Sequence, residues 1–379
     1  MDFRFLLSDQ NGDIEFSADE LEQPFLVSPT EEHPFLTLAD YFEALQKFIM
    51  LDNGTLLQSA LKEQFVLSDI SEIIVRSEKH GAFYHIASVE LPAPEKNIKL
   101  AVTTALSSSA RTSLYEEFFV LQHLAKISAD FIPKTYYKKS IIWKTDSTTE
   151  EFVMVMGEWL DGYHEWHVSD DPDAGDRKIH LWDYDNGYRF LTDDEIYEVL
   201  RQAGFILTFY YDQDSFSQIY PWHHGAGDFI VNTGQDAISV KLVTARDYEP
   251  LVHFDTSEDT DRLVATIHFL LNLVLRMRLD RLDGVIEPVW MGPFALKAAV
   301  AGFFDGLAAI QSDDRHIIEP VTEFLEIMQS FDEQELFDMY DSLLELYAEE
   351  DQDDFRLIQE KLADHTAELH KTLQGYSLD

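Results

Sequence analysis

The chain has 379 residues, 45% of them hydrophobic, which is enough for two domains or one large two-lobed domain with a sizeable core. It carries 28 Lys and Arg against 71 Asp and Glu, a formal net charge of −43. This balance argues strongly against a nucleic-acid binder and against docking on anionic lipid, because both need a basic surface. A solvated acidic surface that aids solubility explains the charge most simply; a salt-adapted source or a basic partner is the alternative.

The chain contains no cysteine, which excludes disulfides, zinc–thiolate sites, iron–sulfur ligation and a cysteine nucleophile. Its start, MDFRFLLSDQNGD, lacks the basic stretch and long apolar run of a signal peptide. The longest apolar run, Val264 to Leu275, is far shorter than the ~20 residues of a membrane span and predicts a buried helix. We therefore expect a cytoplasmic protein without a membrane partner.

The first 68 residues predict an extension made of a hairpin and helices. Phe3 to Phe16 alternates like two strands joined at an Asn11-Gly12 turn. Apolar residues at helical spacing follow Thr37, and a second helix is expected from Thr55 to Gln64. The segment between hairpin and helices reads as loop because of its prolines, Pro24, Pro29 and Pro34.

Residues 69–162 predict a small β-rich lobe. Three segments rich in β-branched and aromatic residues come first, then one helix from Ser113 to Ile127, then two more strands. A turn is expected at Lys79, His80 and Gly81. The predicted strands are 72–77, 82–91, 98–106, 134–143 and 151–160.

Residues 163–330 predict a larger helical lobe, and 331–379 a set of acidic helices. Ser169 to Asp185 reads as an acidic loop; it lacks the ligand spacing of a calcium loop. Thr192 and Glu195 form a capping box that opens a helix reaching Tyr211. Two short strands are predicted at Phe229–Val231 and Ile238–Val243, with a turn at Gly234 between them. Further helices are predicted at Asp261–Leu282, Pro293–Leu307, Val321–Gln329, Asp332–Tyr347 and Asp353–Leu373.

The most informative stretch runs from Tyr220 to Asn232, YPWHHGAGDFIVN. Two histidines precede a Gly-Ala-Gly turn, an aspartate and an apolar strand. Gly225 and Gly227 favour a tight loop, and we expect that loop to aim His223, His224 and Asp228 at a common point.

The order of elements and this loop resemble protein-kinase-like folds, with the aminoglycoside-phosphotransferase branch as the closer likeness. PWHHGAGDFIV lies without gaps on the family's catalytic loop, HGDLHPGNILV, with Gly227 on its glycine and residues 229–231 on its apolar strand. SVKLVTARDYEPL resembles the next strand, VRLIDFDYA. The likeness covers Ile70 to Leu307 and implies an α+β fold of two lobes, with a small antiparallel sheet, a larger helical lobe and an N-terminal extension.

The chain departs from the family at most positions that phosphoryl transfer needs. The lysine of the third strand is replaced by Thr103 or Thr104, and Lys99 lies four residues earlier. Glu117 matches the helix glutamate. The first turn has only Gly81 in place of a glycine-rich phosphate loop.

In the loop, His223 replaces the catalytic aspartate, Asp228 replaces the metal-binding asparagine, and Thr244 replaces the second metal aspartate, with Asp247 three residues later. The resemblance therefore implies a degenerate, pseudokinase-like protein that binds a partner or a small ligand between its lobes. If a nucleotide binds, the positions for it are Thr103, Glu117, Glu158 and Thr244.

Two enzymatic alternatives use the same loop. In one, His224 and Asp228 bind a divalent metal, with His223 or the nearby His164 and His167 completing the site. In the other, His223 and Asp228 work as an acid–base pair in an atypical phosphotransferase-like enzyme, with Glu117 as a third catalytic candidate. A hydrolase is disfavoured because no serine lies in a GxSxG elbow and cysteine is absent. The cofactor stays open between a nucleotide and a divalent metal.

Aromatic residues gather around the predicted connection between the two lobes and around the Tyr220–Asn232 loop, and they suit either a ligand cleft or ordinary core. They are Trp159, Tyr163, Trp166, Trp182, Tyr184 and Trp222. A third possibility is an interaction protein that uses only its acidic helical face. The sequence leaves the ligand, the partner and the oligomeric state undefined.

Overall fold

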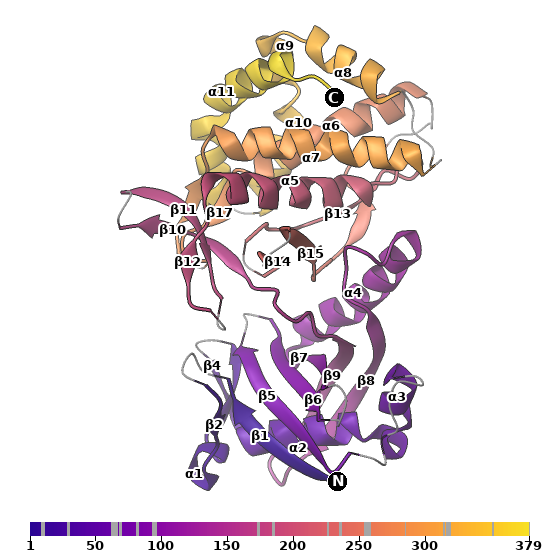
Figure 1. Ribbon diagram of the computed structural model, residues 1–379, viewed down its shortest axis with the longest axis vertical. Coiled ribbons are helices and arrows are strands. Elements are labelled where there is room, and N and C mark those ends of the chain that lie inside the picture. The colour runs from indigo at the N-terminus through magenta and orange to yellow at the C-terminus, as the bar shows by residue number, and fades with distance from the viewer. Residues whose placement is uncertain are drawn as a thin grey trace. The chain divides into compact units, whose positions relative to one another are not determined.

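The computed structural model describes residues 1–8, 12–28, 31–61, 67, 70–80, 83–92, 97–172, 175–183, 186–225, 227–234, 237–253, 259–284, 286–313, 315, 320–350 and 352–378. The chain divides into two compact units, Met1–Asp161 and Gly162–Asp379, here called unit 1 and unit 2. Figure 1 shows the strand-rich first unit and the helix-rich second unit. The α+β class expected from the sequence is confirmed.

Unit 1 is built on a seven-stranded sheet with the order β2-β1-β5-β6-β7-β9-β8. All neighbours are antiparallel except β1 and β5, which run parallel, so the expected antiparallel sheet is in fact mixed. Its strands are β1 (Asp2–Leu7), β2 (Ile14–Glu15), β5 (Glu72–His80), β6 (His85–Leu91), β7 (Ile98–Ala105), β8 (Thr135–Lys144) and β9 (Thr149–Glu158).

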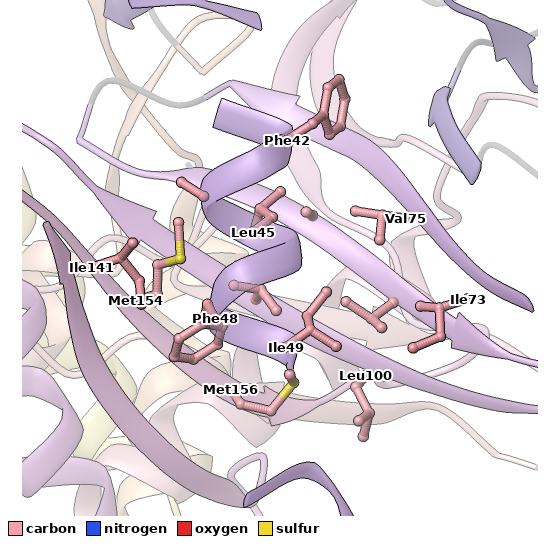
Figure 2. Close-up of a cluster of buried hydrophobic side chains, with 14 of the residues drawn as sticks. Phe42, Leu45, Phe48, Ile49, Ile73, Val75, Leu100, Ile141, Met154 and Met156 are labelled. Atoms are coloured by element: carbon pink, nitrogen blue, oxygen red, sulfur yellow. The ribbon is translucent and has the colours of Figure 1, made fainter. Parts of the chain in front are cut away.

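The two faces of this sheet are covered differently. Helix α2 (Leu38–Ile49) lies across one face and packs its apolar side on the strands, as Figure 2 shows. Helix α4 (Ser108–Ile127) packs on the opposite face, over β7, β8 and β9. Helix α2 begins directly after Thr37, where the sequence predicted it, and the Thr37 side chain caps it. The side chains labelled in Figure 2 are Phe42, Leu45, Phe48, Ile49, Ile73, Val75, Leu100, Ile141, Met154 and Met156.

Residues 1–68 belong to the body of unit 1. The predicted hairpin forms, with Leu6 opposite Glu15, but β1 also joins β5, so it lies inside the main sheet. The prediction of a loop around the prolines was wrong, because β3 (Pro24–Ser28) and β4 (Glu31–Thr37) pair as a two-stranded sheet. Phe25 and Leu36 bury their side chains in the core, which outweighs the local turn signal of the prolines. The remaining helices are α1 (Ala18–Leu21) and α3 (Leu51–Leu61).

Unit 2 is mainly helical, and α5 and α7 form its centre. The capping box of Thr192 and Glu195 opens α5 as predicted. The two helices approach closely at Gly204 and Gly302, where an added side chain would meet the backbone of the other helix. Its helices are α5 (Asp193–Phe209), α6 (Asp259–Arg276), α7 (Pro293–Ser312), α8 (Val321–Ser330), α9 (Glu333–Asp338), α10 (Asp341–Glu350) and α11 (Gln352–Gly375).

Small sheets complete unit 2. The stretch read as an acidic loop is largely a hairpin, because β10 (Trp166–Asp171) and β11 (Asp176–Leu181) pair along their length, with β12 (Arg189–Phe190) beside them. Arg177 and Lys178 face Asp170 and Asp171 across this pair, which offsets the repulsion between its carboxylates. The other strands are β13 (Ser217–Ile219), β14 (Phe229–Asn232), β15 (Ser239–Leu242), β16 (Tyr248–Pro250), β17 (Leu279–Arg281) and β18 (Pro288–Trp290).

The helix predicted over Asp261–Leu282 ends earlier, at Arg276, because Leu279–Arg281 pairs with Pro288–Trp290. Among the described helices, α7 is the one long and apolar enough to cross a membrane by composition, but its apolar window is 67% buried inside the protein, as in a core helix. The turn expected at Lys79 and His80 is a correction, because both residues continue β5 and pair with β6. Some predicted features lie outside the described residues, namely the turn residues Asn11 and Gly81, the helix end at Gln64, and Tyr184.

Candidate functional site

The loop from Tyr220 to Asp228 leads directly into β14, which pairs with β15 in the register Phe229 opposite Leu242. Gly227 has a φ of +83°, a conformation that favours glycine, as the tight turn predicted. Gly225 has a different reason to be small, because an added Cβ would lie 2.8 Å from a carboxylate oxygen of Asp280. Gly225 is therefore packed closely against the side chain of Asp280.

Asp228 is the most tightly held residue of the loop, with 1% of its surface exposed. Arg246 donates to both carboxylate oxygens, from Nη1 to Oδ2 and from Nη2 to Oδ1, each over 2.6 Å. The backbone N–H of His223 also donates to Oδ2, over 2.8 Å. Burial raises the pKa of Asp228, and the guanidinium of Arg246 opposes that rise. Both oxygens of this carboxylate are thus engaged in an internal ion pair.

The two histidines have separate surroundings. His223 is partly buried, and it contacts Asp228 through its backbone N–H rather than its ring. Burial, together with the positive charges of Arg276 and Arg246, lowers the pKa of its imidazole to about 3. His224 is fully buried. Burial also lowers the pKa of His224, opposed by the carboxylate of Asp280 and the main chain of Leu279. Both rings are neutral at pH 7.

A second arginine also holds the loop. Arg276, at the end of α6, is buried, and its Nε and Nη2 donate to the carbonyl of Trp222 over 3.2 and 2.9 Å. Its guanidinium also lies over the rings of Tyr220 and Trp222, with centroid distances of 5.0 and 5.8 Å. Cation–π contacts of this kind are strengthened by burial. Arg246 and Arg276 thus hold the loop at two points, the side chain of Asp228 and the main chain of Trp222.

The histidines at the start of unit 2 are engaged elsewhere. His164 lies 3.4 Å from a carboxylate oxygen of Asp183, and its backbone pairs with Val231. The ring of His167 lies 4.2 Å from that of Trp182 and 3.7 Å from a carboxylate oxygen of Glu165. Within the described ranges no three His, Asp or Glu side chains are grouped so that they could hold a metal ion.

Thr244, at the position of the second metal aspartate, donates its backbone N–H to the carbonyl of Asp228 over 3.4 Å. Asp247 is exposed and accepts the N–H of Tyr248. Neither residue adds a buried carboxylate beside Asp228.

In unit 1, Thr103 and Thr104 lie on opposite faces of β7. Thr103 is on the side covered by α4, together with the partly buried Lys99, whereas Thr104 is buried with the α2 core. Lys99 pairs with Glu78 over 3.1 Å, and its ammonium lies 3.9 Å from the ring centre of Trp159. Glu117 is buried on α4, 4% exposed.

The carboxylate of Glu158 accepts the backbone N–H of Lys134 over 3.1 Å, and so it ties β9 to the start of β8. Of the predicted aromatic cluster, Trp166 and Trp222 are buried core residues, while Trp159, Tyr163 and Trp182 are partly buried. The two buried tryptophans are therefore ordinary core residues.

Sequence reasoning missed the residues that determine the loop's state, namely Arg246, Arg276 and Asp280. One signal was present: Arg276 closes the apolar run of α6, and an arginine there is seldom buried without partners. Arg246 gave no such signal, because it lies 18 residues from Asp228 and meets it only through the pairing of β14 with β15.

The sequence matches no model of a known protein family and no curated protein at a significant level.

Proposed function

We propose that this chain works by binding a protein partner and does not transfer phosphoryl groups, as a degenerate relative of the kinase-like proteins would. The observation that carries the proposal is the bidentate ion pair between Asp228 and Arg246. In the resemblance, Asp228 occupies the metal-binding position. A carboxylate with both oxygens held by a guanidinium is a poor ligand for magnesium, which needs free oxygen donors.

The charges that would stabilise a transferred phosphoryl group lend further support. Lys99 is the nearest lysine of the third strand, and its ion pair is with Glu78 rather than with the buried Glu117. Without a lysine on the phosphates and without metal-binding carboxylates, most of the electrostatic stabilisation of phosphoryl transfer is lost.

The acid–base alternative finds less support in the same geometry. The carboxylate of Asp228 accepts the backbone N–H of His223, so it does not orient the imidazole. With a pKa of about 3, His223 is a weak base at neutral pH, whereas general bases work best near the operating pH. The proposed location is the cytoplasm, and fractionation of cells expressing the tagged full chain tests it.

A nucleotide-binding and turnover assay on the full chain tests the proposal. The melting temperature is measured with ATP, ADP or GTP, each with Mg²⁺ or Mn²⁺, and ATP consumption is followed in parallel. A ligand at 100-fold its dissociation constant would add about 2.7 kcal/mol of stability, a shift that is easily read. We expect neither a shift nor consumption above that of the Glu117→Gln variant. ATP consumption by the wild type that Glu117→Gln abolishes without unfolding the chain would overturn the proposal.

A further inference from the structure

One strand of this acidic chain is basic. Residues 134–144, KTYYKKSIIWK, contain four lysines and no acidic residue, in a chain of net charge −43. In the structure this stretch is β8 with the residue before it. The lysines that do form ion pairs in the described part of the chain include Lys99 and Lys178. By contrast, none of the four here has a carboxylate within 4.0 Å among the described residues, and Lys139 and Lys144 are exposed.

β8 is also an edge strand. It closes the seven-stranded sheet and pairs with β9 alone among the described strands. An edge strand presents main-chain N–H and C=O groups on its outer side, ready to pair with another strand. The Nζ of Lys47 reaches the carbonyl of Ile142 over 3.4 Å, which shows that Ile142 points its main chain outward. By alternation, Ser140 and Lys144 do the same.

Exposed apolar side chains line the same edge. Tyr115 and Phe119 on α4 are each 51% exposed, and Ile142 on β8 is 48% exposed. The ammonium of Lys138 lies close to the rings of Tyr115 and Phe119, 2.6 Å from the centre of the first ring and 3.8 Å from that of the second. Loss of water around this amine lowers the pKa of Lys138 to about 8. A carboxylate that docked here would stabilise the charged form of the amine.

We propose that β8 is a docking edge for an extended acidic segment of a partner protein. The segment adds as a further strand. On the face covered by α4 it places carboxylates on Lys138 and Lys144 and an apolar side chain on Tyr115 and Phe119. On the opposite face, to which Ile141 and Trp143 point, it places a carboxylate on Lys139. Strand addition takes affinity from main-chain bonds and specificity from alternate side chains. The inference rests on the proposed function, since it gives that binding role a surface and a class of partner.

The charge pattern favours this occupant over a second copy of the chain. Two β8 strands side by side would bring their lysines together, and like charges across a strand pair are destabilising. Lysines on an edge can also serve to repel other strands. That protective role does not explain the three exposed apolar side chains, Tyr115, Phe119 and Ile142, beside the edge, because they would promote the association that the lysines prevent.

The test uses the full chain and a fluorescent peptide with the repeat Glu-Glu-Val-Val, about twelve residues long so that it spans β8 and carries both carboxylates and apolar side chains on each face. Binding is followed by fluorescence anisotropy at low and high salt. Two control peptides replace Glu by Gln, or carry N-methyl groups on alternate residues to remove main-chain donors. The variant is Lys139→Glu with Lys144→Glu. Its matched control is Lys297→Glu with Lys371→Glu, two exposed lysines of unit 2 that give the same net charge.

We expect the acidic peptide to bind the wild type and the matched control alike, and to lose about tenfold or more in affinity with the β8 variant and with high salt. Equal binding by the β8 variant, or by either control peptide, would overturn the inference. Self-association in sedimentation velocity that the β8 variant abolishes would also overturn it, because the edge would then be an interface between copies. Failure of peptide binding with no ATP consumption refutes this inference alone, whereas ATP consumption refutes the proposed function.

Discussion

The ion pair of Asp228 with Arg246 makes a sharp prediction about stability. The change is Arg246→Gln, which removes the guanidinium and leaves a buried carboxylate. Removing one partner of a buried pair costs about 3–5 kcal/mol in general. Here Asp228 is buried, but 35% of the Arg246 side chain is exposed, so water screens part of the pair. The N–H of His223 still donates to the carboxylate. We therefore expect a loss of about 2–3 kcal/mol in the free energy of unfolding.

Urea denaturation of the full chain, followed by tryptophan fluorescence and by circular dichroism, measures this loss. The two probes together show whether the two units unfold in one transition or two. The matched control is the double variant Arg246→Gln with Asp228→Asn. It removes the unpaired charge as well, so it should recover part of the stability that the single variant loses.

The deficit of Arg246→Gln should also depend on pH. Burial raises the pKa of Asp228 in the folded state, and the variant lacks the arginine that opposes this rise. A carboxyl with a raised folded pKa binds more protons when folded, so stability increases as pH falls. The variant should therefore approach the wild type between pH 7 and pH 5. A variant as stable as the wild type at pH 7, or a double variant no better than the single one, would refute the structural role assigned to the pair.

Three other predictions follow from single residues. His365 is buried, and its ring hydrogen-bonds the hydroxyl of Tyr340 over 2.8 Å. Burial lowers the pKa of His365 to about 3, so its contribution to the free energy of unfolding is lost as pH falls below about 6.5. A His365→Gln variant should therefore show a shallower fall in urea midpoint between pH 7 and 5. Gly302→Ala should lower the melting temperature strongly, because the added carbon would lie 2.1 Å from a carbonyl of α5, whereas Gly375→Ala meets open space and should be neutral; equal effects would contradict the α5–α7 packing. Affinity for the acidic peptide should fall as pH rises above 8, where Lys138 loses its proton, and an unchanged affinity at pH 9 would remove Lys138 from the surface.

Local signals in the sequence determined much of the secondary structure. The capping boxes at Thr37 and Thr192 involve residues three apart, so they form wherever the helix starts, and the structure shows both. The alternating β-branched residues of β5, β6 and β7 gave those strands, because one face of each is buried.

Contacts between distant residues decided the rest. The prolines of β3 and β4 and the aspartates of β10 and β11 read locally as loop, yet each pair of strands exists because the partner strand supplies the bonds. In the same way, the helix predicted to reach Leu282 ends at Arg276, because β17 pairs with β18.

The candidate site depended on tertiary structure most of all. The sequence placed His223, His224 and Asp228 on one tight loop, and the structure has that loop. What the loop can do was set by Arg246 and Arg276, which come 18 and 54 residues after the groups they hold. A carboxylate's chemistry depends on the charge opposite it, and that charge arrives through strand register and helix packing, neither of which is written in the neighbouring residues.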